Sequence, residues 1–156
     1  MTGGGRGIGA NVARALAEDG WSVVVGARTR EQVEAVAAEI GGTAVELDVA
    51  SAESVERAVA EAGEVELLVD NAGVTGPRRP AWELEPDEWW RFFEVNVRGA
   101  FLCCRAAIPG MLERGRGRIV NVASGAAYLP TSGGDAAYAA SKAALHRFSE
   151  VLAREL

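Results

Sequence analysis

The chain has 156 residues, of which 49% are hydrophobic and 24% are charged, and its net charge at pH 7 is −6. This composition is that of a single globular domain, and the negative charge argues against a nucleic-acid-binding surface. No apolar run approaches the ~18 residues of a membrane span, and the amino terminus has no signal-peptide pattern. We therefore expect a cytoplasmic protein without nucleic-acid or membrane partners.

The chain begins with a glycine-rich turn at residues 2–9, and apolar residues at helical spacing follow it as far as Gly20. Such a turn presents unpaired backbone N–H groups at the positive end of the helix dipole, which favours a phosphate group. Glycines also let the backbone approach a pyrophosphate closely. The glycines here are Gly3, Gly7 and Gly9 rather than the commoner G-x-G-x-x-G, and the alternative is a flexible glycine-rich terminus.

Apolar segments then alternate with helical patterns. Strands are predicted at 21–25, 43–47 and 65–69, and helices at 29–40 and 51–62. Thr29 and Gln32 are spaced as a capping box for the first of these helices, and Ser51 can cap the second. This alternation predicts βαβ units and a parallel sheet.

The second half of the chain starts with an irregular, proline-rich stretch at 74–86. A single long helix is predicted from 87 to about 114, with Pro86 in its first turn. A strand at 118–122 and a helix at 135–156 follow. The aromatic residues of the long helix are expected in the core or an interface. Its adjacent cysteines, Cys103 and Cys104, are expected to be small core residues, and no metal site is expected.

Tyr138 and Lys142 are four residues apart on the last predicted helix. At this spacing both side chains lie on one helix face, with Cβ atoms roughly 5–6 Å apart. A free phenol is a poor acid or base at neutral pH, and a neighbouring ammonium stabilises the phenolate. The pair could therefore act as an acid/base device, although the pentapeptide alone is also consistent with a surface pair.

Polar residues gather where the predicted strands end. Arg28, Asp48, residues 71–73 and Ser124 each follow a strand. In an open parallel sheet, ligands bind outside the carboxyl ends of the strands. This convergence indicates one binding site better than any single motif does.

The whole chain resembles the short-chain dehydrogenase/reductase (SDR) family. The resemblance rests on motifs in the family's order: the glycine turn at 2–9, Asp48, Asn71-Ala72-Gly73, Asn96, Ser124 and Tyr138-x-x-x-Lys142. It implies a Rossmann-like, doubly wound parallel sheet with helices on both faces. The chain would be a single, partial NAD(P)-binding domain over residues 1–156.

The resemblance also implies a catalytic set. Tyr138 would be the acid/base, and Lys142 would stabilise its phenolate and hold the nicotinamide ribose. Ser124 would hydrogen-bond the substrate carbonyl or hydroxyl, and Asn96 would support a proton relay to Lys142. Asp48 and Val49 would contact the adenine ring.

The implied cofactor-binding residues are Gly3, Arg6, Gly7, Ile8, Gly9, Arg28, Asp48, Val49, Asn71, Ala72, Gly73, Tyr138 and Lys142. NAD-specific folds place an acidic residue about 20 positions beyond the glycine turn. Ala27 occupies that place here, followed by Arg28. Two guanidiniums, those of Arg6 and Arg28, could bind a 2′-phosphate. We therefore expect NADP(H) rather than NAD(H).

Compared with the family, the chain is expected to be truncated at both ends. Only Met1 and Thr2 correspond to the family's first strand, which lies in the middle of the sheet, and the strands that follow the active-site helix do not occur before Leu156. We expect an incomplete sheet with unpaired edges, and hence a poorly soluble chain. A complete fold would form a homodimer or homotetramer, with a dimer contact through the helices near 97–113 and 137–155.

The leading functional hypothesis is an NADP-dependent oxidoreductase that interconverts a carbonyl and an alcohol of a small-molecule substrate. The alternative is a truncated, non-catalytic nucleotide-binding fragment of such an enzyme. A methyltransferase also uses a glycine-rich turn after a strand, but it has no role for the Tyr138–Lys142 pair or for residues 71–73.

Overall fold

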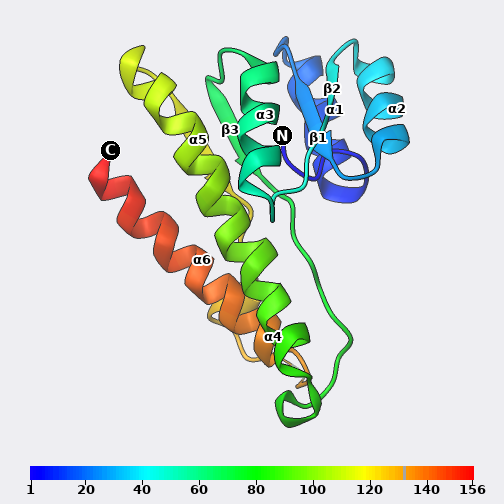
Figure 1. Cartoon of the computed structure of the whole chain (residues 1–156), viewed down its shortest axis with the longest axis vertical. Coiled ribbons are helices and arrows are strands. Elements are labelled where there is room, and N and C mark those ends of the chain that lie inside the picture. The colour runs from blue at the N-terminus through cyan, green and yellow to red at the C-terminus, as the bar shows by residue number, and fades with distance from the viewer. Residues whose placement is uncertain (132) are drawn as a thin grey trace.

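Strands and helices alternate along the chain in the computed structural model, which describes residues 1–131 and 133–156 (Figure 1). The strands are β1 (Val24–Ala27), β2 (Thr43–Glu46), β3 (Leu67–Asp70) and β4 (Arg118–Asn121). The helices are α1 (Gly7–Glu18), α2 (Arg30–Ile40), α3 (Ala52–Ala62), α4 (Pro86–Phe93), α5 (Gly99–Glu113) and α6 (Ala136–Glu155). Short helical turns η1 (Ala81–Glu83) and η3 (Gly125–Ala127) and a π-helical segment, η2 (Glu94–Arg98), complete the order.

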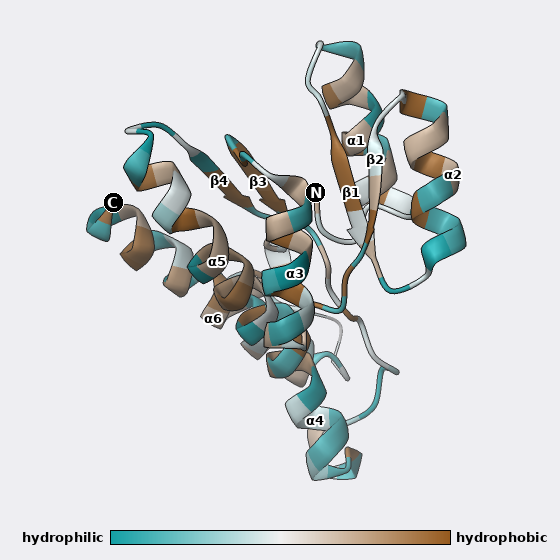
Figure 2. Cartoon of the chain, turned by 45° about the horizontal axis from the view of Figure 1, so that its top comes forward, coloured by the Kyte–Doolittle hydropathy of each residue, from teal (hydrophilic) through white to brown (hydrophobic). Residues whose placement is uncertain are grey.

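The sheet consists of two parallel strand pairs. β1 pairs with β2 and β3 pairs with β4. Within the described residues the two pairs are joined through Thr2 alone, which forms single parallel bridges to Gly26 and to Asp70. The amino terminus accordingly lies between β1 and β3 in Figures 1 and 2. The predicted α/β class and its parallel strands are confirmed, and the sheet is incomplete.

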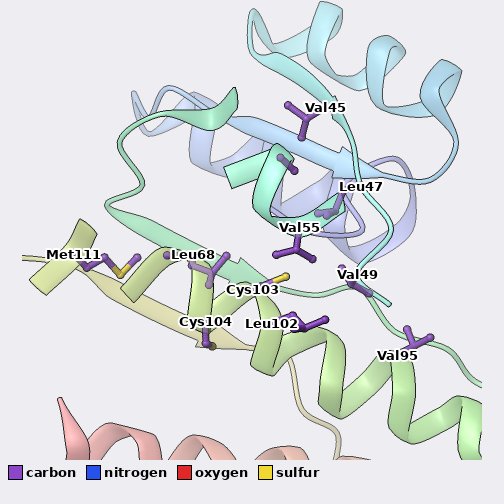
Figure 3. Packing of buried hydrophobic residues seen from close by; sticks show 12 residues of the cluster. Val45, Leu47, Val49, Val55, Leu68, Val95, Leu102, Cys103, Cys104 and Met111 are labelled. Carbon is purple, nitrogen blue, oxygen red and sulfur yellow. The ribbon is translucent and has the colours of Figure 1, made fainter. Parts of the chain in front are cut away.

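Helices cover both faces of this sheet. α1 and α2 pack with β1 around a cluster that includes Val25 and Val33, while α3 and α5 pack with β2 and β3 around a second cluster. The adjacent residues Ala44 and Val45 of β2 belong to opposite clusters, as the alternation of a strand requires. Figure 3 shows the second cluster, which extends from Val45 past Val55 and Leu68 to Met111.

The two cysteines lie in this second cluster, as expected. Cys103 and Cys104 are 2% and 1% exposed. Burial raises the pKa of both thiols, that of Cys104 to about 12. They are therefore protonated, small core residues and not nucleophiles.

Several element boundaries differ from the prediction. The strand predicted at 21–25 begins at Val24, because pairing with β2 starts there, and Trp21 remains 44% exposed. The capping box predicted at Thr29 is wrong, since its side chain makes no cap hydrogen bond. Gln32 instead packs beside Gly5, where a Cβ in place of the glycine hydrogen would lie 2.9 Å from the Gln32 Cβ. The cap at Ser51 is confirmed, because its side chain accepts from the Ser54 N–H.

The single helix predicted from 87 to about 114 is wrong in one respect. It is divided into α4 and α5 by the π-helical η2, which contains Asn96. Pro86 stands in the first turn of α4 as predicted, and Glu85 and Glu88 form its capping box. Among the described residues, no helix has both the length and the apolar character needed to cross a membrane.

Candidate active site

The glycine turn closes tightly onto the start of α1. Gly3 and Gly7 adopt φ angles of +62° and +57°, which residues other than glycine rarely adopt. A Cβ on Gly9 would lie 2.2 Å from the Gly3 carbonyl oxygen. The backbone of the turn is therefore exposed to a ligand on one side and packed against α1 on the other.

Thr2 and Asn71 fix this turn to the end of β3. The Asn71 Nδ2 donates to the carbonyl oxygens of Thr2 and Gly3, each at 3.2 Å. In return, the Thr2 Oγ1 accepts from the N–H groups of Asn71 and Ala72, at 3.1 and 3.0 Å. Because these bonds link chain segments about 70 residues apart, the turn is held in place by tertiary contacts as well as by its own sequence.

A groove of about 480 Å³ lies in front of the turn, across the carboxyl ends of β1, β2 and β3. We call it the glycine-turn groove. Most of the predicted cofactor-binding residues line it: Gly3, Arg6, Gly7, Ile8, Arg28, Asp48, Val49, Asn71, Ala72 and Gly73. Gly9 lies beneath the turn, and Tyr138 and Lys142 stand on α6. The groove's position agrees with the general rule for ligand sites in parallel sheets.

The groove carries both signs of charge. Arg6 and Arg28 are exposed at its rim. The Asp48 carboxylate accepts from the Ala50 N–H at 3.0 Å, so it is tied to the loop before α3. Thr29 and Gln32 also line the groove. Their position just beyond the β1 carboxyl end could have revealed them, but the sequence prediction used them as a helix cap.

Lys142 lies at the inner end of this region and is only 4% exposed. Its Nζ donates to the Val122 carbonyl oxygen at 2.8 Å, and burial lowers its pKa. A Cβ on Gly73 would lie 3.6 Å from this Nζ and 3.1 Å from the Asn96 Oδ1. Gly73 therefore marks the junction between the glycine-turn groove and the α6 helix.

Asn96 is 1% exposed and bridges two elements. Its Oδ1 accepts from the Val74 N–H at 2.8 Å, and its Nδ2 donates to the Val74 carbonyl oxygen and to the Ser141 Oγ. Ser141 Oγ in turn donates to the Tyr138 carbonyl oxygen at 2.7 Å. Sequence reasoning missed Ser141, because a serine next to a lysine on a helix gives no signal of its own.

Ser124 and Tyr138 approach the same region from β4 and α6. Ser124 follows β4 and caps η3, and its Oγ accepts from the Ala126 N–H at 3.2 Å. η3 packs against α6, with the Tyr128 ring edge-on to His146 at 5.6 Å. Tyr138 is half-buried in the first turn of α6, one turn before Lys142. The fold thus places Asn96, Ser124, Tyr138 and Lys142 on elements that converge beside the groove.

Comparison with known proteins identifies the family. The short chain dehydrogenase family profile matches residues 1–156, and the chain belongs to that family. It is 38% identical to 2-dehydro-3-deoxy-L-rhamnonate dehydrogenase (NAD(+)) of Sphingomonas sp. (strain SKA58), covering 100% of this chain and 64% of that protein. It is 33% identical to NADP-dependent 3-hydroxy acid dehydrogenase YdfG of Salmonella typhi, covering 100% of this chain and 65% of that protein.

Solved structures agree. A 3-ketoacyl-(acyl-carrier-protein) reductase from Brucella melitensis complexed with NADH superposes with a TM-score of 0.96 at 38% identity, covering 99% of this chain and 68% of that chain. The closed form of a serine dehydrogenase complexed with NADP+ superposes with a TM-score of 0.94 at 30% identity, covering 100% of this chain and 65% of that one. The chain thus spans about two thirds of the length of these relatives.

Proposed function

We propose that the chain is the cofactor-binding and catalytic part of an NADP-dependent oxidoreductase that interconverts a carbonyl and an alcohol. One observation carries this proposal. Gly73 lines the glycine-turn groove and also faces both Asn96 Oδ1 and Lys142 Nζ. A nucleotide lying along the groove would therefore end beside the residues of α6.

The residues have distinct tasks in this proposal. A bound nicotinamide cofactor supplies or accepts the hydride. Tyr138 gives a proton to the substrate oxygen during reduction and takes it back during oxidation, while Ser124 hydrogen-bonds the same oxygen. The Lys142 ammonium stabilises the tyrosine's anionic form, and its other donors are available to the cofactor ribose.

In this proposal, only the side-chain oxygen of Asn96 can take part in a proton relay. Both Nδ2 protons are used, by the Val74 carbonyl and by Ser141. Its Oδ1 keeps one lone pair beyond the bond from the Val74 N–H. A proton relay can therefore reach this side chain only as an acceptor, on the side that faces Gly73 and Lys142.

The preference for NADP rests on the rim of the groove. The relatives include both an NAD(+) enzyme and an NADP-dependent enzyme, and the two solved structures hold NADP+ and NADH. In this chain Ala27 stands where an acidic residue would bind the ribose 2′-hydroxyl. Arg6 and Arg28 lie at the same groove, and guanidiniums bind phosphate through paired hydrogen bonds.

Titration of both cofactors by fluorescence tests this preference. NADPH should bind more tightly than NADH, and Ala27→Asp with Arg28→Ala should reverse the order, because a carboxylate replaces a phosphate-binding cation. Arg30→Ala is the matched control, since Arg30 pairs with Glu34 on the exposed face of α2. Equal affinities for the two cofactors in the unchanged chain would overturn the assignment.

A second candidate is a nucleotide-binding fragment without turnover. It is favoured by the division of the sheet into two strand pairs. Saturable NADPH binding with no oxidation of NADPH by a broad set of aldehydes and ketones would support it. Turnover that Tyr138→Phe abolishes would exclude it.

A further inference from the structure

The chain that follows the glycine-turn groove packs against the segment that leads into α6. The Arg79 N–H donates to the Gly134 carbonyl oxygen at 3.2 Å, and a Cβ on Gly134 would lie 3.0 Å from the Arg78 carbonyl carbon. Gly134 has a φ of +73°, which residues other than glycine rarely adopt. Residues 78–79 and 134–135 therefore form a close backbone contact, which fixes where their side chains begin.

The two adjacent arginines at this contact have different partners. The Arg79 Nη2 donates to both carboxylate oxygens of Glu88, at 2.8 and 2.6 Å, so this guanidinium is used within the fold. The Arg78 side chain is 72% exposed, and its Nε approaches the Asp135 Oδ1 at 3.4 Å. A guanidinium has five N–H donors in a planar fork. Asp135 lies on the Nε side of the Arg78 fork, and the exposure of the side chain leaves other donors open to a ligand.

Asp135 connects Arg78 to the proposed acid/base. Asp135 is the N-cap of α6 and Tyr138 is the third residue of the helix, and these two positions are neighbours in the first turn. The Asp135 carbonyl oxygen accepts from the Ala139 N–H at 2.8 Å, so this turn is closed. The Arg78 guanidinium is therefore anchored to the same helical turn that carries Tyr138.

We propose that Arg78 is a substrate-binding residue and that the substrate is an oxo acid or the corresponding hydroxy acid. This inference rests on the proposed function, because the substrate oxygen lies at Ser124 and Tyr138 while its carboxylate binds Arg78. A guanidinium and a carboxylate form paired, charge-assisted hydrogen bonds, which fix orientation as well as position. The carboxylate itself does not react. Hydride passes between the cofactor and the carbonyl carbon, and the proton passes between Tyr138 and the carbonyl oxygen.

The ion pair with Asp135 separates this proposal from a purely structural role. If the pair only holds the two segments together, breaking it from either side has the same effect on every substrate. If Arg78 binds the substrate carboxylate, the negative charge of Asp135 opposes that carboxylate at short range. Asp135→Asn then removes the repulsion and keeps an oxygen that accepts from the Arg78 Nε, while Arg78→Ala removes the binding group.

The probes are acetoacetate and levulinate, each compared with its methyl ester, which has a ketone at the same position and no charge. Saturation-transfer NMR of the 156-residue chain with NADP+ measures binding without turnover, because an oxidised cofactor cannot reduce a ketone. At least one of the oxo acids should bind about tenfold or more tightly than its ester. With NADPH, the advantage should appear mainly in KM, since the ester keeps the group that reacts.

Matched variants locate the effect. Arg78→Ala should weaken binding of the preferred oxo acid by about tenfold or more and leave the ester unchanged, and Arg78→Lys should restore part of the loss. Asp135→Asn should tighten binding of the acid by about two- to fivefold and leave the ester unchanged. Arg147→Ala is the control, because it removes the same charge from an exposed pair with Glu150 farther along α6. It should change the affinity for neither compound.

Three results would overturn the proposal. The first is equal binding of each acid and its ester, and the second is the absence of binding of both acids. The third is a shift in the same direction for Arg78→Ala and Asp135→Asn, because the pair would then only hold the two segments together. The proposed function fails differently, through a lack of NADPH binding or of ester reduction, so the two failures are distinguishable.

Discussion

Three polar side chains of this protein act on backbone groups of distant segments. Asn71 holds the glycine turn, Asn96 holds the chain after β3, and Lys142 holds the chain after β4. Each uses part of its hydrogen-bonding capacity to order a loop. The loops beside the candidate catalytic side chains are therefore fixed at their ends by tertiary hydrogen bonds.

The Tyr138 hydroxyl is expected to be needed for chemistry and not for binding. In a chain extended to the length of its relatives, Tyr138→Phe should lower turnover by roughly 10²–10⁴-fold, the usual contribution of a positioned proton-transfer group. NADPH affinity should barely change, because the ring remains. Lys142→Ala should lower both turnover and NADPH affinity, since its ammonium serves both. Steady-state kinetics with cofactor titration measures this. Near-normal turnover of Tyr138→Phe would show that the tyrosine is not the acid/base.

Asp70 introduces a pH dependence of stability. It is 5% exposed, and burial raises the pKa of its carboxyl from 3.8 to about 7. The folded chain therefore holds this proton more tightly than the unfolded chain does. The stabilising contribution is fully present below about pH 4 and is lost as the pH rises through about 7.

Asp70→Asn tests this assignment. The amide oxygen can still accept from the Thr2 hydroxyl, which approaches the Asp70 Oδ1 at 3.4 Å, but it cannot ionise. The variant's free energy of unfolding should rise relative to the unchanged chain between about pH 4 and 7, and the difference should level off above that range. Urea unfolding at several pH values measures it. Parallel stability profiles would contradict a raised pKa at this carboxyl.

At the scale of elements, the π-helical η2 is the feature that connects fold and site. An extra residue in the turn re-aims the side chains of one helix, and here Asn96 is the residue that it contains. Gly99, the first residue after this segment, packs closely against Val49: a Cβ on Gly99 would lie 2.9 Å from the Val49 Cγ2. α5 thereby packs against the loop after β2, while Asn96 reaches Val74.

The Asn96 anchor should contribute measurably to stability. Asn96→Leu leaves the partly buried backbone N–H and carbonyl of Val74 without their partner and should cost about 1–3 kcal/mol. Ser141→Ala removes one bond to Asn96 and should cost about 0.5–1.5 kcal/mol. The two effects should not add, because they share that bond. Urea unfolding of the two single variants and of the double variant measures this, with the exposed Thr75→Ala as control. Full additivity would mean that the two residues act independently.

The sequence was sufficient for features that depend on short-range chemistry. Turn glycines, capping by Ser51 and residues that end strands are determined locally, so the groove-lining set could be predicted. The π-helical segment could not, because it depends on bonds from Asn96 to residues far along the chain. Ser141 was missed for the same reason, because its role comes from its hydrogen bond with Asn96, which is 45 residues away in the sequence. Gln32 was missed because the prediction assigned it to a helix cap.

At the scale of the whole molecule, the incomplete sheet dominates. The resemblance to the family indicated a missing central strand, and the structure shows β1 and β3 bridged by Thr2 alone among the described residues. An apolar groove of about 610 Å³ lies between α5, β4 and α6, lined by residues such as Ile108, Ile119 and Leu152. Figure 2 shows that much of α5 and β4 is apolar. Apolar residues of α5, β4 and α6 therefore line an open groove.

We expect the isolated chain to associate non-specifically beyond a dimer. Apolar side chains such as Phe101 and Leu112 are exposed on α5, and Val120 of the edge strand β4 is 43% exposed. Edge strands with exposed apolar residues pair with other chains, and a lysine on the edge opposes this. Sedimentation velocity should show species that grow with concentration, and Val120→Lys should shift them to smaller sizes. Ala38→Lys on α2 adds the same charge away from β4 and should change little. A single sharp monomer or dimer with cooperative thermal unfolding would contradict this expectation, and a defined dimer would instead favour a contact through α5 and α6.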